Sequence, residues 1–388
     1  MKILYIASET RWSGASIALF HLIQELQLHH QIHVLLPNST GRLYKELQNL
    51  NVKCYQTSYS LSVFPQRGNL ILRSYRLLKK IIINRRAENY LKEIIENISP
   101  DIVHNNVGPL DLSLRLCKEK NIIHVWHQRE YQNKDFNMTF FPSTHCFRKK
   151  IHSDGNYNIA ITKGVFSHWK LRNVDRVIYD GVIDTAKHPS KGAHTQKENY
   201  FLFVGRIEPA KGLDMLLTAF SRFFENEKDF KLLIVGSFCK DEYFNHCMSI
   251  INQHKMDTSV SFLGEKDNVY SIMSKATALV VPSRFEGFGF ITAEAMYNDC
   301  LVIGRNTGGT KEQFDNGISL TGANIGLSFE TIDDLEKRLN EAASLDTTEI
   351  RERAFKVVSE NYTTVINAQN IENFYQDILQ QHISKRDK

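Results

Sequence analysis

Short apolar runs alternate with longer stretches of helical periodicity along the whole chain. The runs lie at 2–7, 32–37, 101–106, 122–127 and 158–162, and then at 200–205, 230–236, 259–264, 278–283 and 300–304. Runs of this length without alternation are typical of buried parallel strands. Helices are predicted at 15–28, 70–97 and 109–120, and then at 212–226, 240–255, 289–297 and 331–343. Strand and helix alternating over this length predict two doubly wound α/β domains.

A polar segment, residues 184–199, separates the two series of strands. It contains a proline and a glycine and lacks periodicity, so we expect it to be the linker. An apolar stripe over 363–381 predicts a helix near the end of the chain. The expected division is a first domain of residues 1–183, a second of 184–362 and a closing helix within 363–388.

Composition adds little to this picture and excludes some classes of protein. The 388 residues are 42% hydrophobic and 23% charged, which is ordinary for a folded protein. The six cysteines are scattered without a C-x-x-C pair, so we expect reduced thiols, a cytoplasmic location and no zinc site. The start, "MKILYIASE", shows no cleavable leader pattern, and no apolar run approaches the ~18–20 residues of a membrane span.

Charge is divided unequally between the two halves. Residues 1–184 hold 25 Lys and Arg against 15 Asp and Glu, a net +10, whereas residues 185–388 hold 23 against 28, a net −5. A basic half indicates an anionic partner. The stretch 70–97 is either a helix packed on the first sheet or a helix that also rests on anionic lipid. The second alternative uses Arg73, Arg76, Lys79, Lys80, Arg85 and Arg86. Nothing resembles a nucleic-acid reading motif, so no nucleic acid is expected.

The stretch "RFEGFGFITAEAM" carries the first candidate chemistry. Glu286 and Glu294 stand eight residues apart, between the predicted strand 278–283 and a predicted helix. Doubly wound folds bind ligands at this edge of a parallel sheet. Gly287 and Gly289 let a ligand approach the backbone, and a helix start favours anions. Because carboxylates only accept hydrogen bonds, they suit sugar hydroxyls on either side of a phosphate.

Two other strand ends supply partners for such an anion. "FVGRIEPAKG" places Arg206 and Lys211 around a turn, where they can neutralise a diphosphate leaving group without a metal. "IGRNTGGTKE" offers the backbone donors of Gly308, Gly309 and Thr310. A lone E-x7-E pattern arises often by chance. The three loops in this order after buried strands favour a functional site.

Together, "FVGRIEPAKGLDMLLTAF", "VSFLGEKDNVYSIMSKATALVVPSRFEGFGFITAEAM" and "NTGGTKE" resemble the retaining, nucleotide-sugar-dependent glycosyltransferases of family four. The resemblance is strong over about 175–310 and weaker over the first half. It implies the GT-B fold, two Rossmann-like domains facing each other across a cleft, with the final helix crossing back to the first domain. It also implies that Glu286 contacts the donor sugar and Glu294 the ribose. Arg206 and Lys211 would hold the diphosphate, with no metal or other cofactor.

The first half resembles the family at two points. "SETRWSGASIALFHLIQEL" is similar to its glycine-rich first loop, with Ser13-Gly14 in place of Gly-Gly, and "VWHQRE" matches its strand-end histidine. The match puts His127 near the reacting sugar, although a core histidine is the alternative. The family often has an acid after this histidine, where the chain has Gln128. Whether Arg129 or Glu130 substitutes for that acid stays open.

Together with these observations, the resemblance implies a retaining glycosyltransferase that uses a UDP-sugar, or GDP-mannose, and extends a glycan or lipid-linked acceptor in bacterial surface polysaccharide synthesis. Without a motif for a nucleophile, a front-face route assisted by the leaving phosphate is favoured. The first domain would bind the acceptor and the second the donor, at the inner face of the cytoplasmic membrane. The alternatives are a donor-binding subunit without catalysis and an epimerase or hydrolase on the same fold. The expected catalytic residues are Glu286, His127, Arg206 and Lys211. The expected donor site adds Gly14, Gly287, Phe288, Gly289 and Glu294. For Phe288, a role in packing is the alternative.

Overall fold

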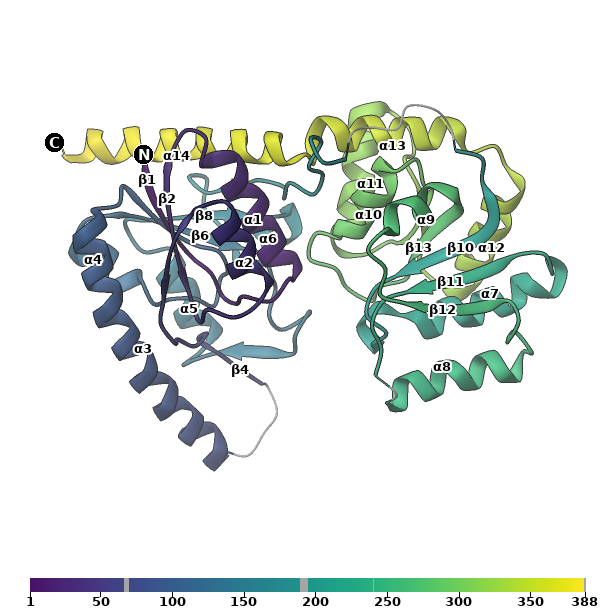
Figure 1. Ribbon diagram of the computed structural model, residues 1–388, viewed down its shortest axis with the longest axis horizontal. Coiled ribbons are helices and arrows are strands. Elements are labelled where there is room, and N and C mark those ends of the chain that lie inside the picture. Colours follow the sequence, from purple (N-terminus) through teal and green to yellow (C-terminus); the bar gives the residue numbers. More distant parts are fainter. Residues whose placement is uncertain (66–69, 189–194, 240, 387–388) are drawn as a thin grey trace. The chain divides into compact units, whose positions relative to one another are not determined.

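The chain divides into two compact units, shown in a computed structural model that describes residues 1–65, 70–188, 195–239 and 241–386 (Figure 1). The first unit comprises Met1–Gly181 and Thr364–Lys388, and the second comprises Val182–Thr363. The chain therefore passes between units twice, at Gly181–Val182 and at Thr363–Thr364, and the expected linker 184–199 belongs to the second unit. Within that segment, residues 189–194 lie outside the described residues.

The first unit is built on a seven-stranded parallel sheet in the order β3-β2-β1-β5-β6-β8-β9. Its strands are β1 (Lys2–Ile6), β2 (Gln31–Leu36), β3 (Lys53–Gln56), β5 (Ile102–Asn105), β6 (Ile123–Gln128), β8 (Asn156–Ala160) and β9 (Arg176–Val177). A separate antiparallel pair joins β4 (Val63–Pro65) to β7 (Met138–Phe140).

Helices cover both faces of this sheet. They are α1 (Gly14–Leu26), α2 (Arg42–Asn49), α3 (Leu70–Ile98), α4 (Leu114–Glu119), α5 (Thr144–Ile151), α6 (Lys163–Trp169) and α14 (Thr364–Arg386). Alternate residues of β1 serve the two cores. Ile3 and Tyr5 pack in one cluster with residues of α1, α2 and α14, while Leu4 and Ile6 pack in another with residues of α3 and α4. The alternation follows from the two-residue repeat of a strand.

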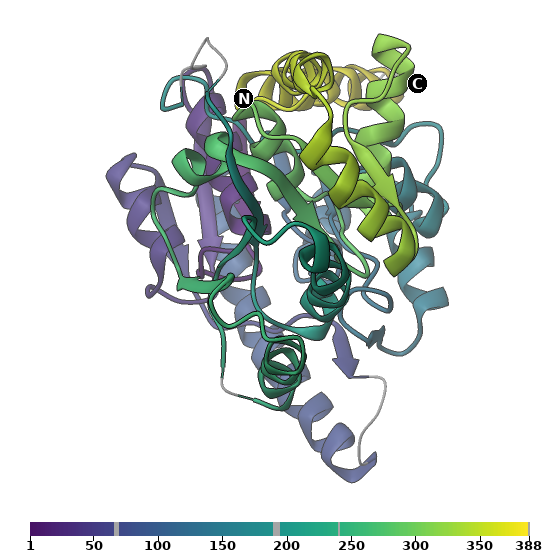
Figure 2. The ribbon, with the colours of Figure 1, turned by 90° about the vertical axis from the view of Figure 1, so that its right-hand side faces the viewer.

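The second unit repeats the plan with a six-stranded parallel sheet in the order β12-β11-β10-β13-β14-β15. The strands are β10 (Glu198–Val204), β11 (Lys231–Val235), β12 (Val260–Gly264), β13 (Ala276–Val281), β14 (Val302–Arg305) and β15 (Leu327–Phe329). Its helices are α7 (Leu213–Asn226), α8 (Glu242–Gln253), α9 (Val269–Lys275), α10 (Phe290–Tyr297), α11 (Gly308–Thr321), α12 (Ile332–Ser344) and α13 (Thr348–Asn361), and η1 (Pro209–Lys211) is a single 3-10 turn. Helices α7, α8 and α12 share one core, whereas α9, α10, α11 and α13 lie on the other face (Figures 1 and 2).

All ten predicted strands are present, with bounds within two residues of expectation. The predicted helix 109–120 is wrong in its first part, because α4 begins only at Leu114. There the Asn105 amide donates to the carbonyl of Leu110, and the hydroxyl of Ser113 donates to Asn105 at 2.8 Å. These side-chain bonds hold the segment as a loop. Among the described residues, no helix combines the length and apolarity needed to cross a membrane.

Candidate functional site

The centre of the candidate site in the second unit is an ion pair between Lys211 and Glu286. The ammonium of Lys211 lies 2.5 Å from Glu286 Oε1, and the hydroxyl of Ser283 donates to the same oxygen at 2.7 Å. Their side chains are partly exposed, Lys211 at 25% and Glu286 at 14%. Strand order explains the meeting, because β10 and β13 are neighbours and their carboxyl ends lie side by side. One carboxylate oxygen therefore takes two donors while the side chain remains open to solvent.

The turn after Lys211 is held against the end of β13 by Gly212. Its φ is +68°, and a Cβ there would lie 2.3 Å from the carbonyl oxygen of Pro282. Only glycine permits that approach. Arg206, the other cation of this loop, is more exposed, at 67%, and its guanidinium pairs with Glu208 at 3.0 Å. The loop thus presents one fixed and one solvated cation.

The Gly-Gly of α11 packs against the loop of Glu286, which removes Gly309 from the three expected backbone donors. The N–H of Gly309 donates to the carbonyl oxygen of Glu286 at 3.0 Å, so it is committed within the protein. A Cβ at Gly308 would lie 2.3 Å from Glu286 O, and one at Gly309 would lie 2.0 Å from Phe288 O. The first turn of α11 therefore packs directly against the loop that carries Glu286.

Gln313 joins the same helix to the same loop by hydrogen bonds, and no sequence pattern pointed to this residue. Its side chain is buried, and its amide nitrogen donates to the carbonyls of Phe288 at 2.7 Å and Gly289 at 3.1 Å. The Phe288 side chain is only 3% exposed and packs on Phe290 and Tyr362. Any contact of Phe288 with the nucleotide sugar must therefore be made by its backbone. Gly289 has φ +86° where α10 begins, and Gly287 is partly exposed. The loop is thereby held on both sides.

Glu294 lies five residues into α10, partly buried. It accepts a hydrogen bond from the hydroxyl of Tyr270 at 3.3 Å. Burial raises the pKa of the Glu294 carboxyl to about 7, against a smaller lowering by the Tyr270 hydroxyl. Tyr270 is a second residue that sequence reasoning missed. A carboxyl that titrates near neutrality can change its hydrogen-bonding role when a ligand arrives.

In the first unit, His127 is completely buried near the end of β6. Its Nδ1 lies 3.2 Å from His104 Nε2 and 3.3 Å from a guanidinium nitrogen of Arg129. Arg129 in turn pairs with Asp180, because its Nη1 donates to both carboxylate oxygens, at 2.5 and 2.6 Å. Burial and the charge of Arg129 hold the pKa of the His127 imidazole well below its usual value. The imidazole is therefore neutral at physiological pH.

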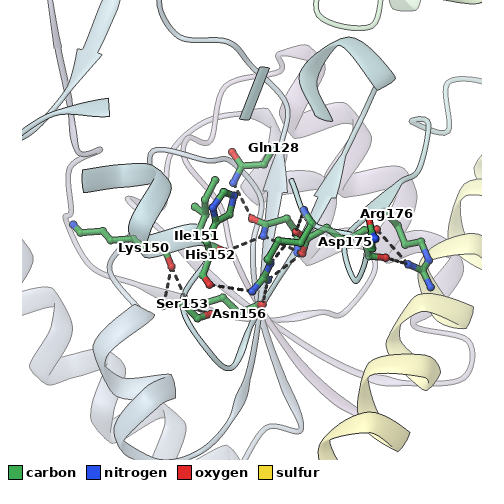
Figure 3. A network of polar contacts seen from close by, with 11 residues as sticks. Gln128, Lys150, Ile151, His152, Ser153, Asn156, Asp175 and Arg176 are labelled. Atoms are coloured by element: carbon green, nitrogen blue, oxygen red, sulfur yellow. Dashed lines mark hydrogen bonds and ion pairs between the residues drawn. The ribbon is translucent and has the colours of Figure 1, made fainter. Parts of the chain in front are cut away.

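The three residues after His127 have different surroundings. Gln128 is buried and donates to Asn158, which bonds to Asp175 in the polar network of Figure 3. Gln128 is thus part of the scaffold. Arg129 is engaged in its ion pair with Asp180. Only Glu130 is partly exposed, and burial, followed by the nearby Asp135, raises the pKa of its carboxyl to about 7. The Glu130 carboxylate accepts a hydrogen bond from the side-chain amide of Gln132.

Gly14 is exposed at the first position of α1. A Cβ at this residue would have no atom within 4 Å. Internal packing therefore gives no reason for glycine here, in contrast to Gly212 and Gly309. The neighbouring Ser13 donates to Glu9 at 2.6 Å. Among the described residues, no group of three or more His, Cys, Asp or Glu side chains is arranged to hold a metal.

Comparison with known proteins matches residues 184–356 to the family model of "Glycosyl transferases group 1". The match covers nearly the whole second unit. An uncharacterised glycosyltransferase of Methanocaldococcus jannaschii is 33% identical over 144 residues, 37% of each chain. Alignments with this and the next two curated relatives span between 28% and 37% of those relatives' lengths.

Two longer likenesses include the first unit. The capsular polysaccharide biosynthesis glycosyltransferase CapH of Staphylococcus aureus is 21% identical over 326 residues, 79% of this chain and 81% of CapH. The crystal structure of HepE from Anabaena in complex with UDP has a TM-score of 0.74 at 16% identity, covering 97% of this chain and all of HepE. The chain therefore has the GT-B fold, with two Rossmann-like α/β domains.

Proposed function

We propose that this GT-B chain is a glycosyltransferase that uses a nucleoside diphosphate sugar. The observation that carries the proposal is the Lys211–Glu286–Ser283 cluster. It lies at the carboxyl ends of adjacent parallel strands, within the segment that matches the group 1 family. An ammonium beside a carboxylate at that edge suits a ligand that carries both a phosphate and sugar hydroxyls.

The proposed division of roles combines what the family resemblance implies with the chemistry of each group. Lys211 and Arg206 neutralise the diphosphate as it leaves, since cations stabilise charge that develops on a leaving group. The ammonium of Lys211 has three N–H donors, so its bond to Glu286 leaves capacity for a phosphate. Glu286 accepts from the donor sugar and Glu294 from the ribose. Gly287, Phe288 and Gly289 contribute backbone beside them. In the first unit, we propose Gly14 as a further donor-binding residue and His127 as a further catalytic residue.

We propose retention of anomeric configuration by a front-face route. The bond from the anomeric carbon to the phosphate oxygen breaks, and the acceptor hydroxyl attacks from the same face. The leaving phosphate takes the proton of that hydroxyl. The cations supply the charge stabilisation that a metal gives elsewhere, so turnover should persist in a chelator. A UDP-sugar is favoured, because the fold's likeness includes a UDP-bound protein, and GDP-mannose is the alternative.

The acceptor is proposed to be a glycan or a lipid-linked glycan of bacterial surface polysaccharide. The likeness to CapH, which acts in capsular polysaccharide biosynthesis, supports this class. We further propose a cytoplasmic protein that attaches peripherally to the membrane, where such an acceptor resides.

Helix α3 supplies the surface for that attachment. Its C-terminal half packs into the first unit through Ala87, Leu91 and Ile94. The segment 75–86 instead exposes large apolar side chains together with basic ones and contains no acid. The exposed apolar residues are Tyr75, Leu78, Ile81 and Ile82, with exposures of 50% to 66%, and the exposed basic residues are Arg76, Lys79, Arg85 and Arg86. This mixture on one helix is typical of interfacial attachment to anionic lipid.

Lys80 does not belong to that surface. Its ammonium donates to the carbonyls of Leu61 and Val63 at 3.0 and 2.7 Å and lies over the ring of Phe64. The side chain of Arg73 lies outside the described residues. The proposed lipid contact therefore rests on four of the six basic residues first considered.

A donor-binding subunit without catalysis is the second candidate. Gln128 favours it, because this residue is part of the scaffold where related enzymes often have an acid. Release of nucleoside diphosphate from a donor by the purified chain would exclude it.

The test is a thermal-shift panel with UDP-glucose, UDP-N-acetylglucosamine and GDP-mannose. A ligand that binds only the native state raises its melting temperature with occupancy. We expect one donor to give a clear shift that Lys211→Met reduces. Lys228→Met, which removes a lysine that covers Phe224, should leave the shift unchanged. If no nucleotide sugar shifts the melting temperature, the proposed function is wrong.

A further inference from the structure

A chain of hydrogen bonds leads through the buried core of the first unit to His127. The hydroxyls of Tyr5 and Tyr375 are 3.0 Å apart, and the Tyr375 hydroxyl lies 2.5 Å from His104 Nδ1. His104 Nε2 then lies 3.2 Å from His127 Nδ1. Four elements contribute, since Tyr5 is on β1, Tyr375 on α14, His104 on β5 and His127 on β6. All four side chains are completely buried.

The direction of these bonds follows from Arg129. A guanidinium only donates hydrogen bonds, and one of its nitrogens lies 3.3 Å from His127 Nδ1. His127 Nδ1 must therefore be an acceptor without a proton. His104 then donates to it from Nε2, which leaves His104 Nδ1 to accept from the Tyr375 hydroxyl. Tyr375 in turn accepts from Tyr5, so every donor along the chain points toward His127.

The remaining proton of His127 is on Nε2, and this N–H has no hydrogen-bond partner in the part of the chain that the structure describes. The nearest carboxylate oxygen, Asp180 Oδ1, is 4.0 Å away and already accepts from Arg129. A buried donor without a partner costs roughly 1–3 kcal/mol. Unpaired buried groups of this kind are often ligand-binding or catalytic.

We propose that Tyr5, Tyr375 and His104 are positioning residues that, with Arg129, fix His127 as its Nε2–H tautomer and so offer that N–H to an oxygen of a bound sugar. This inference rests on the proposed function. It makes His127 a neutral hydrogen-bond donor and not a base. It also assigns a role to α14, whose Tyr375 stabilises the histidine tautomer from a distant part of the sequence.

The tautomer can be measured without any substrate. In full-length protein labelled with ¹⁵N-histidine, long-range proton–nitrogen spectra distinguish the two neutral tautomers from the cation, and His127→Gln assigns the signals. We expect His127 to carry its proton on Nε2 at neutral pH. A proton on Nδ1, or a cationic ring, would overturn the proposal even if donor binding is confirmed.

Turnover tests the consequence. Tyr375→Phe and His104→Leu should lower kcat for release of nucleoside diphosphate about tenfold, which is the worth of one strong hydrogen bond, with KM for the donor unchanged. His104→Gln, whose amide can still donate to His127 Nδ1, should retain most of the activity. Tyr200→Phe is the control, because Tyr200 is buried in the second unit and bonds only to the carbonyl of Ile272 in the described hydrogen bonds.

The outcomes separate the two proposals. If Tyr375→Phe and His104→Leu turn over the donor as Tyr200→Phe does, the positioning role is refuted. If the wild-type protein releases no nucleoside diphosphate from any donor of the panel, the proposed function fails, and the spectra still decide the tautomer. Melting temperatures of the variants show whether any loss of activity reflects unfolding.

Discussion

At the scale of residues, the site depends on pairs that neighbouring strand ends bring together. Lys211 and Glu286 meet because β10 and β13 are adjacent, which the order of strands in a doubly wound sheet makes foreseeable. Ser283 and Tyr270 were not foreseeable, since a serine after a strand and a tyrosine in a short helix have no distinctive pattern. They emerge only when the loops are placed in space.

We expect Glu294 to make donor binding dependent on pH. Burial raises the pKa of its carboxyl to about 7 in the folded protein, so below that pH it is protonated. Ribose hydroxyls donate to a carboxylate, and nucleotide affinity should therefore increase as pH rises through about 7. In Glu294→Gln this increase should be absent. Calorimetric titration with UDP between pH 6 and 8 is the measurement.

Glu130→Gln is the matched control, because the pKa of Glu130 is also raised to about 7 but this residue lies in the first unit. It should keep the pH dependence of UDP affinity. The raised pKa of Glu294 affects folding stability in the opposite direction to UDP affinity. Since the folded protein binds a proton more tightly than the unfolded chain, this contribution is present at low pH and is lost as pH rises through 7. A UDP affinity that stays constant from pH 6 to 8 in the wild type would refute the assignment.

At the scale of elements, tertiary contacts decide what local sequence leaves ambiguous. Ten strands follow from apolar runs alone, whereas the short strands β3, β4, β7, β9 and β15 were not predicted. Helix α11 was not, because its sequence "GGTKEQFDNGISLT" contains three glycines and few strong helix formers. The helix forms where Gly309 and Gln313 bond to the loop of Glu286. The same glycines that suggested a ligand loop thus serve the packing of a helix.

Two glycine substitutions separate packing from ligand approach. Gly309→Ala places a Cβ 2.0 Å from a backbone oxygen, so α11 must shift, and we expect a loss of about 1–3 kcal/mol in the free energy of unfolding. Gly14→Ala meets nothing within 4 Å and should leave stability unchanged, while donor turnover falls if a ligand approaches this position. Urea unfolding followed by circular dichroism, with turnover alongside, tests both. Equal stability of the two variants would contradict the packing argument.

Helix α3 predicts a membrane-binding phenotype. Two double variants should abolish co-sedimentation with vesicles that contain anionic lipid: Leu78→Ser with Ile82→Ser, and Arg85→Glu with Arg86→Glu. The first removes exposed apolar side chains of segment 75–86, and the second reverses exposed basic ones. Charge reversal should matter only with anionic lipid. The matched control is Lys118→Glu, an exposed lysine on α4. Equal recovery of wild-type protein in the supernatant with neutral and anionic vesicles would exclude the surface.

At the scale of the whole molecule, α14 returns the end of the chain to the first unit. Ile371, Phe374, Tyr375 and Ile378 are buried there beside β1 and α1. The sequence predicted this helix from its apolar stripe, and its return to the first domain was an implication of the family resemblance. The boundary at Gly181–Val182 was harder to predict, since the polar segment that marks it belongs to the unit that follows.

Phe374→Ala should destabilise the first unit selectively. Its ring is 3% exposed within that core, and such truncations cost about 3–5 kcal/mol. All three tryptophans, Trp12, Trp126 and Trp169, lie in the first unit, so tryptophan fluorescence in urea reports on it alone. Phe238→Ala, at 38% exposure in the second unit, should leave that transition in place. A fluorescence midpoint that does not move in Phe374→Ala would contradict the role of α14.

The central claim is that Glu286 acts on the donor sugar within a site that Lys211 and its neighbours complete. The most direct measurement is release of nucleoside diphosphate from the donor that the thermal-shift panel identifies, with Glu286→Gln compared to wild type and to Glu242→Gln, an exposed residue of α8. The account predicts a fall of about 10²-fold or more in Glu286→Gln, with the melting temperature and affinity for free nucleotide retained. Turnover close to wild type in that variant would contradict it.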